Sequence, residues 1–266
     1  MLHYDHYYTI GFTHTVCEDY ATQGNTPTPF IVLSDGCSSS DNTDVGARLL
    51  TLTTKSLLEK ANDWPWDYSQ FGHKLIDKAK TVIKEMKLPL SVLHATVMLA
   101  FLDQEQDNIM VYVYGDGCLL LKDHNGNVRT IEIAFVHNAP YYLSYWGNQD
   151  VFLEYMMYES YSLILRDSAK GKSKPKLFNS PLIFRFPLKE FKTVAIASDG
   201  VGQCLDIRRR TKLTVNEVAN DLLAFPNTSD EFIKRHLEST LKKYAIAGFY
   251  PLDDLSIAVL TQEIGV

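Results

Sequence analysis

The chain has 266 residues, 45% of them hydrophobic, which is enough for one large domain or two small ones with a substantial core. Its formal net charge of −6 argues against nucleic acid or an anionic membrane as the main partner. No apolar stretch approaches the ~20 residues that span a bilayer, and the N-terminus lacks the basic and apolar parts of a signal peptide, so we expect a cytoplasmic protein.

Hydrophobic periodicity predicts strands and helices along the whole chain. We expect strands at residues 7–12, 29–33, 94–102, 109–114, 118–122, 128–133, 193–197 and 255–260. We expect helices at 44–60, from 67 to shortly before 89, near 214–225 and near 229–247. The last two begin at pairs that fit capping boxes, Thr214 with Glu217 and Thr228 with Glu231.

The order of these elements predicts an α/β fold. Short connections between consecutive strands imply antiparallel pairing. Two pairs of helices enclosing such strands predict a four-layer α/β/β/α sandwich, with two mostly antiparallel sheets flanked by the helix pairs. We expect a single domain over residues 1–266, because the acidic motifs described below span nearly the whole chain and would have to meet. We also expect a monomer.

Residues 134–192 are harder to interpret. They are rich in tyrosine and tryptophan and contain a lysine and serine loop at 168–176. One interpretation is a flap or insertion that covers a substrate site. The other is a set of additional strands with an ordinary aromatic core. The sequence leaves both open.

Three predicted strands end in an aspartate followed by glycine: Asp35 with Gly36, Asp116 with Gly117, and Asp199 with Gly200. Two more acidic pairs lie beside predicted strands, Glu18 with Asp19 and Asp253 with Asp254. A carboxylate at the end of a buried strand is costly unless a positive charge meets it. If these strand ends converge, the partner is one divalent cation or more, and Mg²⁺ or Mn²⁺ suits oxygen ligands of this kind.

These motifs, in this order and over nearly the whole chain, resemble the metal-dependent serine/threonine phosphatases of the protein phosphatase 2C (PP2C, PPM) type. The Ala95–Thr96 pair that opens a predicted strand is similar to a segment of that family. The differences from the family pattern, given below, resemble a divergent, bacterial-like branch. The resemblance implies a phosphorylated protein as the substrate and Mn²⁺ or Mg²⁺ as the cofactor, as two ions or three.

The resemblance also implies the roles of the acidic residues. Asp35 would bridge two ions, with Asp199 and Asp254 completing the site of the first ion. The Gly36 carbonyl and water would complete the site of the second ion. Asp116 would join Asp199 at a third metal position.

Glu18 and Asp19 would complete the catalytic set by holding metal-bound water. The implied reaction is direct hydrolysis of phosphoserine or phosphothreonine. Two cations ~3.5 to 4 Å apart lower the pKa of a shared water toward ~7, so that hydroxide attacks the phosphorus. A phosphoenzyme is not required.

The chain departs from the family pattern around the substrate. His14 stands where the family has an arginine that grips phosphate. We expect protonated His14 to bind the substrate phosphate in its place, although it lacks the two-pronged guanidinium. Cys37, Ser38, Ser39 and Ser40 replace a run rich in glycine or containing histidine. Two alternatives to a phosphoprotein phosphatase therefore stay open: a pseudophosphatase that binds a phosphoprotein as a regulator, and a small-molecule phosphatase on the same fold.

Overall fold

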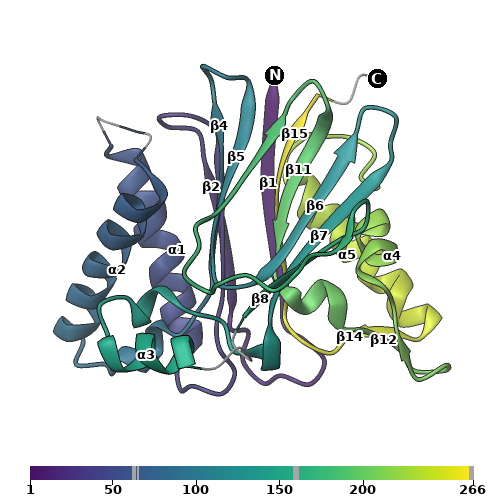
Figure 1. Cartoon of the computed structure of the whole chain (residues 1–266). Helices are drawn as coiled ribbons and strands as arrows, with labels where there is room; N and C mark the ends of the chain where they lie inside the picture. The colour runs from purple at the N-terminus through teal and green to yellow at the C-terminus, as the bar shows by residue number, and fades with distance from the viewer. Residues whose placement is uncertain (62–63, 65, 158–161, 264–266) are drawn as a thin grey trace.

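The computed structural model describes residues 1–61, 64, 66–157 and 162–263. Two β-sheets pack face to face between two layers of helices (Figure 1). Helices α1 (Thr43–Glu59) and α2 (Tyr68–Glu85) cover one sheet, and α4 (Val215–Leu222) and α5 (Phe232–Ala247) cover the other. The predicted four-layer α/β/β/α sandwich is confirmed.

All neighbouring strands in the two sheets are antiparallel. The larger sheet has the order β1 (Leu2–Thr9), β15 (Leu255–Gln262), β11 (Phe191–Ala197), β6 (Gly117–Asp123), β7 (Val128–Phe135), β8 (Leu163–Asp167) and β9 (Gly171–Lys172). The other has the order β10 (Leu182–Pro187), β5 (Asn108–Tyr114), β4 (Val97–Asp103), β3 (Phe30–Asp35) and β2 (Asp19–Gly24). A small third sheet contains β13 (Thr211–Lys212), β12 (Cys204–Asp206) and β14 (Phe249–Pro251).

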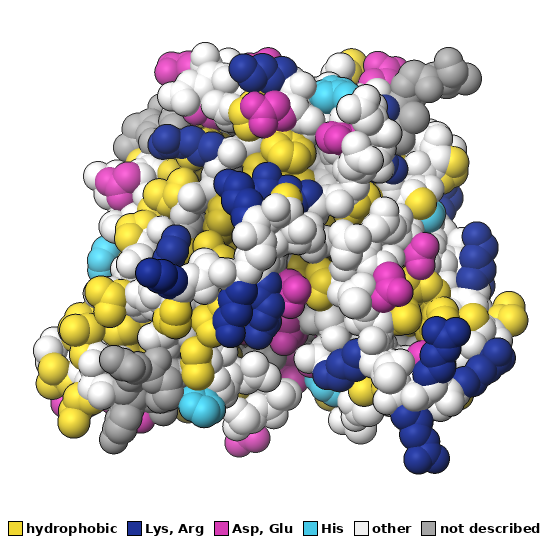
Figure 2. Space-filling model, turned by 45° about the vertical axis from the view of Figure 1, so that its right-hand side comes forward, with side chains coloured by type: hydrophobic (Ala, Val, Ile, Leu, Met, Phe, Trp, Pro, Cys, Tyr) yellow, Lys and Arg dark blue, Asp and Glu magenta, His cyan; other side chains and the backbone are white. Residues whose placement is uncertain are grey.

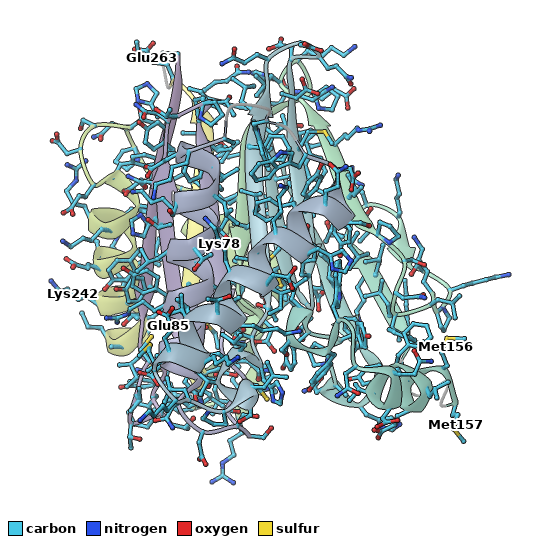
Figure 3. All side chains as sticks on the ribbon, turned by 90° about the vertical axis from the view of Figure 1, so that its left-hand side faces the viewer. Lys78, Glu85, Met156, Met157, Lys242 and Glu263 are labelled. Carbon is cyan, nitrogen blue, oxygen red and sulfur yellow. The ribbon has the colours of Figure 1, made fainter. Side chains whose placement is uncertain are left out.

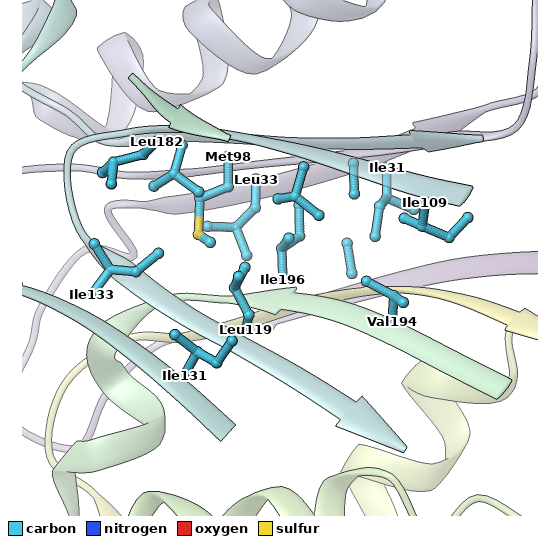
Figure 4. Packing of buried hydrophobic residues seen from close by; sticks show 14 of the residues in the cluster. Ile31, Leu33, Met98, Ile109, Leu119, Ile131, Ile133, Leu182, Val194 and Ile196 are labelled. Carbon is cyan, nitrogen blue, oxygen red and sulfur yellow. The ribbon is translucent and has the colours of Figure 1, made fainter. Parts of the chain in front are cut away.

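The alternation of side chains along a strand explains how the layers join. In β3, Ile31 and Leu33 point into the space between the sheets, while Phe30 and Val32 point toward α1 and α2. The strand is apolar on both faces because both faces are covered. Figure 4 shows Ile31 and Leu33 packed with residues of the opposite sheet, including Ile196 of β11.

The helix starts test the capping motifs. Thr214 and Glu217 form the predicted capping box, in which the Thr214 side chain accepts from the Glu217 N–H and the Glu217 side chain accepts from the Thr214 N–H. The second prediction is wrong, because α5 begins at Phe232 after Glu231, whose side chain makes no capping hydrogen bond. Asp230 has a φ of 51°, which turns the chain just before the helix.

Among the described helices, none has both the length and the apolar character needed to cross a membrane.

The segment between β7 and β11 contributes both helices and strands over its described residues, and the flap at 134–192 stays a prediction. Its described residues include the short 3₁₀ helices η2 (Val136–Asn138) and η3 (Leu143–Tyr145) and the helix α3 (Gln149–Met157), which lies near the lower end of α2 (Figure 1). Strands β8, β9 and β10 then extend the two sheets. Its aromatic residues also pack together, with the rings of Tyr141 and Phe178 4.5 Å apart.

The N-terminal strand was predicted at 7–12, but β1 runs from Leu2 to Thr9. It is an edge strand of mixed His and Tyr residues, which pairs along its whole length with β15. A half-buried edge strand of this composition has no apolar run to mark it. Residues 10–14 instead form the loop that leads to β2 and to the acidic end of the sandwich.

Gly46 of α1 tests the contact between this helix and η1 (Leu90–Leu93). A Cβ atom at Gly46 would lie 1.6 Å from the Val92 carbonyl oxygen. Gly→Ala in a helix normally stabilises by roughly 1 kcal/mol. Here we expect Gly46→Ala to lower the free energy of unfolding by about 1–3 kcal/mol, measured by urea denaturation, because the helix must move off η1.

The matched control is Thr53→Ala, a partly exposed position of the same helix, which should leave stability nearly unchanged or raise it slightly. Equal or greater stability of Gly46→Ala would contradict the close approach of α1 to η1.

Candidate active site

Strand ends from both sheets bring four aspartates to one end of the sandwich. Asp35 ends β3, Asp116 follows β5, Asp199 follows β11 and Asp253 precedes β15. They line a hollow of about 270 Å³, here called the acidic hollow, together with Gly36, Cys37, Ser38, Ser39, Thr96, Asn138, Pro140 and Tyr142. In Figure 2, acidic side chains lie within a cleft at the lower end of the molecule.

The turn after β3 is held in place by contacts to Thr96, the residue before β4, and to the N-terminal loop. The Thr96 N–H donates to the Asp35 carbonyl at 2.8 Å, and the Gly36 N–H donates to the Glu18 carbonyl at 3.1 Å. A Cβ at Gly36 would lie 2.9 Å from the Thr43 Cβ and 3.0 Å from the Glu18 carbonyl oxygen. Glycine at this position therefore lets the backbone of the turn lie close to both neighbours.

The two neighbouring aspartates before β15 have different surroundings. Asp254 is buried, and its Oδ1 and Oδ2 accept from the N–H groups of Gly11 at 2.7 Å and Glu18 at 2.6 Å. Asp253 lines the acidic hollow and accepts from the Asp254 N–H at 2.9 Å. Asp254, the predicted ligand, thus holds the N-terminal loop, and Asp253 presents its carboxylate to the hollow.

Burial and mutual repulsion raise the pKa of three carboxyl groups in the hollow, those of Asp35, Asp116 and Asp199. Burial, followed by the charge of Asp199, raises the pKa of Asp116 to about 8. Burial, followed by the charge of Asp253, raises the pKa of Asp199 to about 6. Burial and the charges of neighbouring aspartates raise the pKa of Asp35 well above its ordinary range.

Asp19 lies directly opposite Asp35 in the pairing of β2 with β3. It is 3% exposed, and its side-chain oxygens have no hydrogen-bond partner among the described residues. Burial raises the pKa of Asp19 to about 7, and the nearby hydroxyls of Ser256 and Ser198 offset this only in part. A buried carboxyl group in this condition needs a positive charge or a proton donor beside it.

The residues present fit a divalent metal site. None of the described residues that line the hollow is Lys or Arg, so they provide no balancing cationic side chain there. The available donors are carboxylate oxygens and the Gly36 carbonyl, to which no backbone N–H among the described loop residues donates. Hard oxygen donors of this kind are the ligands that Mg²⁺ and Mn²⁺ prefer.

A second acidic group lies beside the hollow. His14, Glu18 and Asp254 bring candidate ligand atoms within 4.8 Å of one another. The His14 Nδ1 lies 3.2 Å from Asp254 Oδ1, and its Nε2 lies 3.2 Å from Asp253 Oδ1. Burial alone would lower the pKa of His14, but the hydrogen bond and charge of Asp254, with the other acids, raise it. The neighbouring carboxylates thus raise the pKa of His14, and both of its ring nitrogens face carboxylates.

Glu18 is oriented by α1, because the Thr43 hydroxyl donates to its Oε1 at 2.9 Å. Thr43 is fully buried at the start of the helix. Burial raises the pKa of Glu18, and this hydrogen bond opposes the rise. Thr43 thus links the helix to the acidic end of the sandwich.

The predicted site residues come together to different degrees. Asp35, Gly36, Asp116 and Asp199 line one hollow, whereas His14 and Glu18 gather with Asp254 beside it. The sequence prediction did not include Asp253 or Thr43 among the functional residues, nor Asn138 and Tyr142, which come from the segment between β7 and β8. The one signal in the sequence for Asn138 and Tyr142 was the candidate flap in that region.

Comparison with protein families gives a match to protein phosphatase 2C over residues 13–242. A comparison with curated proteins finds no match. Among solved structures, the serine/threonine phosphatase Stp1 from Staphylococcus aureus is 14% identical, with a TM-score of 0.61 over 99% of this chain and 96% of that one.

The S. agalactiae serine/threonine phosphatase is 16% identical, with a TM-score of 0.60 over 99% of this chain and 100% of that one. The Mycobacterium tuberculosis serine/threonine phosphatase PstP/Ppp is 14% identical, with a TM-score of 0.55 over 99% of each chain. At such identities these structures establish the fold, and the family match establishes the relationship. Because that match covers most of the sequence, the chain belongs to the protein phosphatase 2C family.

Proposed function

We propose that this protein is a metal-dependent phosphoprotein phosphatase that hydrolyses phosphoserine and phosphothreonine. The observation that carries the proposal is the gathering of Asp35, Asp116, Asp199 and Asp253 in one open hollow with no cationic side chain among the described lining residues. Family membership supports a serine/threonine phosphatase, and the relatives named above are described as such enzymes.

The metal ligands we propose are Asp35, the Gly36 carbonyl, Asp199 and Asp253, with Asp116 beside Asp199 at a third position. Asp253 replaces Asp254 in this set, because both oxygens of Asp254 accept backbone N–H groups. Bound Mg²⁺ or Mn²⁺ would lower the pKa of water and offset the charge of the phosphoryl oxygens.

The protein's own groups prepare the site for this chemistry. Asp254 fixes the Glu18 backbone, and Thr43 fixes the Glu18 side chain. Glu18 and Asp19 then present carboxyl groups that can accept hydrogen bonds from water. At the rim, the hydroxyls of Ser38 and Ser39 can donate hydrogen bonds to a substrate phosphate.

A pseudophosphatase is the second candidate. It is favoured by His14, whose ring nitrogens both lie 3.2 Å from carboxylates and so are not free for phosphate in this arrangement. Metal-dependent release of phosphate from a phosphothreonine peptide and from an aryl phosphate separates the two functions. Turnover supports the phosphatase, and binding of the phosphopeptide without turnover supports the regulator.

Replacing the proposed central ligands tests the assignment. We expect Asp35→Asn or Asp199→Asn to reduce Mn²⁺-dependent phosphate release by at least about a hundredfold, because each substitution removes a charge that holds the ions. The control is Asp41→Asn, an exposed aspartate of the loop between β3 and α1, which should retain near wild-type turnover. Near wild-type rates for Asp35→Asn would refute the assignment.

Substitutions at Asp253 and Asp254 should distinguish the residue that binds metal from the residue that stabilises the fold. We expect Asp254→Ala to lower the free energy of unfolding by about 2–4 kcal/mol even in chelator, because it removes the acceptor of one buried and one partly buried backbone N–H group. Asp253→Ala should have little effect in chelator but should weaken stabilisation by Mn²⁺. Thermal melts of both variants with and without metal provide the measurement, and the opposite pattern would return the ligand role to Asp254.

Metal should stabilise the wild-type protein, and more strongly at pH 8 than at pH 6. The raised pKa values of Asp199, Asp19 and Asp116 mean that the metal-free folded state keeps protons that the unfolded chain has lost near pH 4. Stability in chelator is therefore lost as pH rises through about 6 to 8. Ion at a hundred times its dissociation constant adds about 2.7 kcal/mol, or roughly 5–10 °C in Tm.

Differential scanning fluorimetry in EDTA and in Mn²⁺ at the two pH values measures this difference. Identical melting temperatures with and without metal at pH 8 would argue against a preformed cluster of charged carboxylates.

A further inference from the structure

A strongly basic segment forms the side of the sandwich at which both sheets end. Residues 168–189 contain six basic residues and no Asp or Glu, in a chain whose net charge is −6: Lys170, Lys172, Lys174, Lys176, Arg185 and Lys189. All six side chains are exposed. The segment includes β9 and β10, which are the end strands of the two sheets on this side.

A groove of about 460 Å³ lies between these end strands. Lys170, Lys172 and Arg185 line it together with three aromatic side chains, Phe184, Phe186 and Phe191, and we call it the basic groove. On the face shown in Figure 2, Lys and Arg side chains gather near exposed hydrophobic side chains.

The acidic residues of the basic groove neutralise only part of the positive charge of its Lys and Arg side chains. Asp167 receives two hydrogen bonds from the Arg129 guanidinium, at 2.9 and 2.6 Å, so its charge is already paired. Glu190 is the other acid among the described lining residues. The three remaining cations therefore exceed the unpaired acidic charge and favour an anionic occupant.

One side of β10 offers unpaired backbone groups. Strand β10 has β5 as its neighbour and is the end strand of its sheet. The Leu188 N–H donates to the Asp107 carbonyl at 3.1 Å, so these two residues form a hydrogen-bonded pair. Along an antiparallel ladder such pairs alternate with pairs whose N–H and C=O groups point away from the partner strand. By this alternation, Ile183 and Arg185 direct their N–H and C=O groups away from β5, and none of the described loop hydrogen bonds uses them.

We propose that the basic groove binds an acidic, extended segment of a protein partner, which adds to β10 as a further strand. Backbone pairing would provide affinity, and alternate side chains would meet the basic rim and the aromatic floor. Pro187 has no N–H and occupies the next outward position, so pairing with β10 would end before it.

The aromatic floor favours a peptide over a nucleic acid. Phe186 is 5% exposed, its ring lies edge-on to Phe191 at 5.6 Å, and it stacks on Phe184 at 6.2 Å. These rings pack on one another and leave little free face for stacking on bases. The concave shape and the free strand edge likewise favour a peptide strand over a membrane surface.

The test is direct binding, measured by fluorescence anisotropy, of a labelled peptide of about ten residues in which glutamate alternates with valine. We expect saturable binding that weakens as salt rises. A peptide with lysine in place of glutamate should not bind. Absence of saturable binding, equal binding of the lysine peptide, or tighter binding of phosphatidylserine vesicles or a single-stranded oligonucleotide would overturn the proposal.

Matched variants locate the site. We expect Lys170→Glu/Lys172→Glu to weaken peptide binding at least tenfold. The control Lys242→Glu/Lys243→Glu makes the same change in net charge on α5, where Lys242 points into solvent (Figure 3), and should bind as wild type. Equal weakening in both variants would show a non-specific effect of charge and contradict the site.

A second pair tests the strand edge itself. Ile183→Pro removes one outward N–H without changing charge, and we expect it to weaken peptide binding at least tenfold, while Ile183→Val should bind normally. Circular dichroism and hydrolysis of an aryl phosphate report whether each variant is folded. If folded Ile183→Pro binds the peptide like wild type, pairing with β10 is refuted.

Discussion

Repulsion among buried carboxylates is the constraint on which the rest of the structure depends. Asp19 and Asp35 face each other across β2 and β3, and Asp116 and Asp199 enter the same region from the other strands. Like charges held this close raise one another's pKa and oppose folding unless a cation or protons offset them. The sandwich holds them together because its strands are paired with their neighbours and the space between its sheets is filled by buried hydrophobic side chains. Such an arrangement favours a site that operates with metal bound.

The N-terminal loop is the second element that this site requires. Buried Asp254 accepts N–H groups on both sides of the His14 position, and Glu18 is thereby fixed beside the hollow. Gly11 packs so closely on this turn that a Cβ would lie 2.2 Å from the Asp253 carbonyl carbon. One aspartate therefore has a structural role and its neighbour faces the hollow, although the two are adjacent in the chain. The His14 ring contacts both aspartates, with one ring nitrogen 3.2 Å from Asp253 Oδ1 and the other 3.2 Å from Asp254 Oδ1.

Much of the fold could be predicted from the sequence because its signals are local. Apolar runs marked β3, β5, β11 and β15, and spacing of apolar residues marked α1 and α2. The short strands β9, β12, β13 and β14 carried no such signal, since two or three residues have no periodicity. Asp-Gly pairs at strand ends indicated the acidic hollow. The sequence prediction chose Asp254 over Asp253 as the ligand, but it contained no information on which carboxylate meets the distant N–H groups of Gly11 and Glu18.

The most direct measurement is anomalous scattering at the manganese edge from crystals of the protein soaked in Mn²⁺. The account predicts at least two peaks, each within coordinating distance of Asp35, with Asp199 and Asp253 among the ligands. Peaks confined to the His14, Glu18 and Asp254 group, or no peak in the acidic hollow at saturating Mn²⁺, would contradict it.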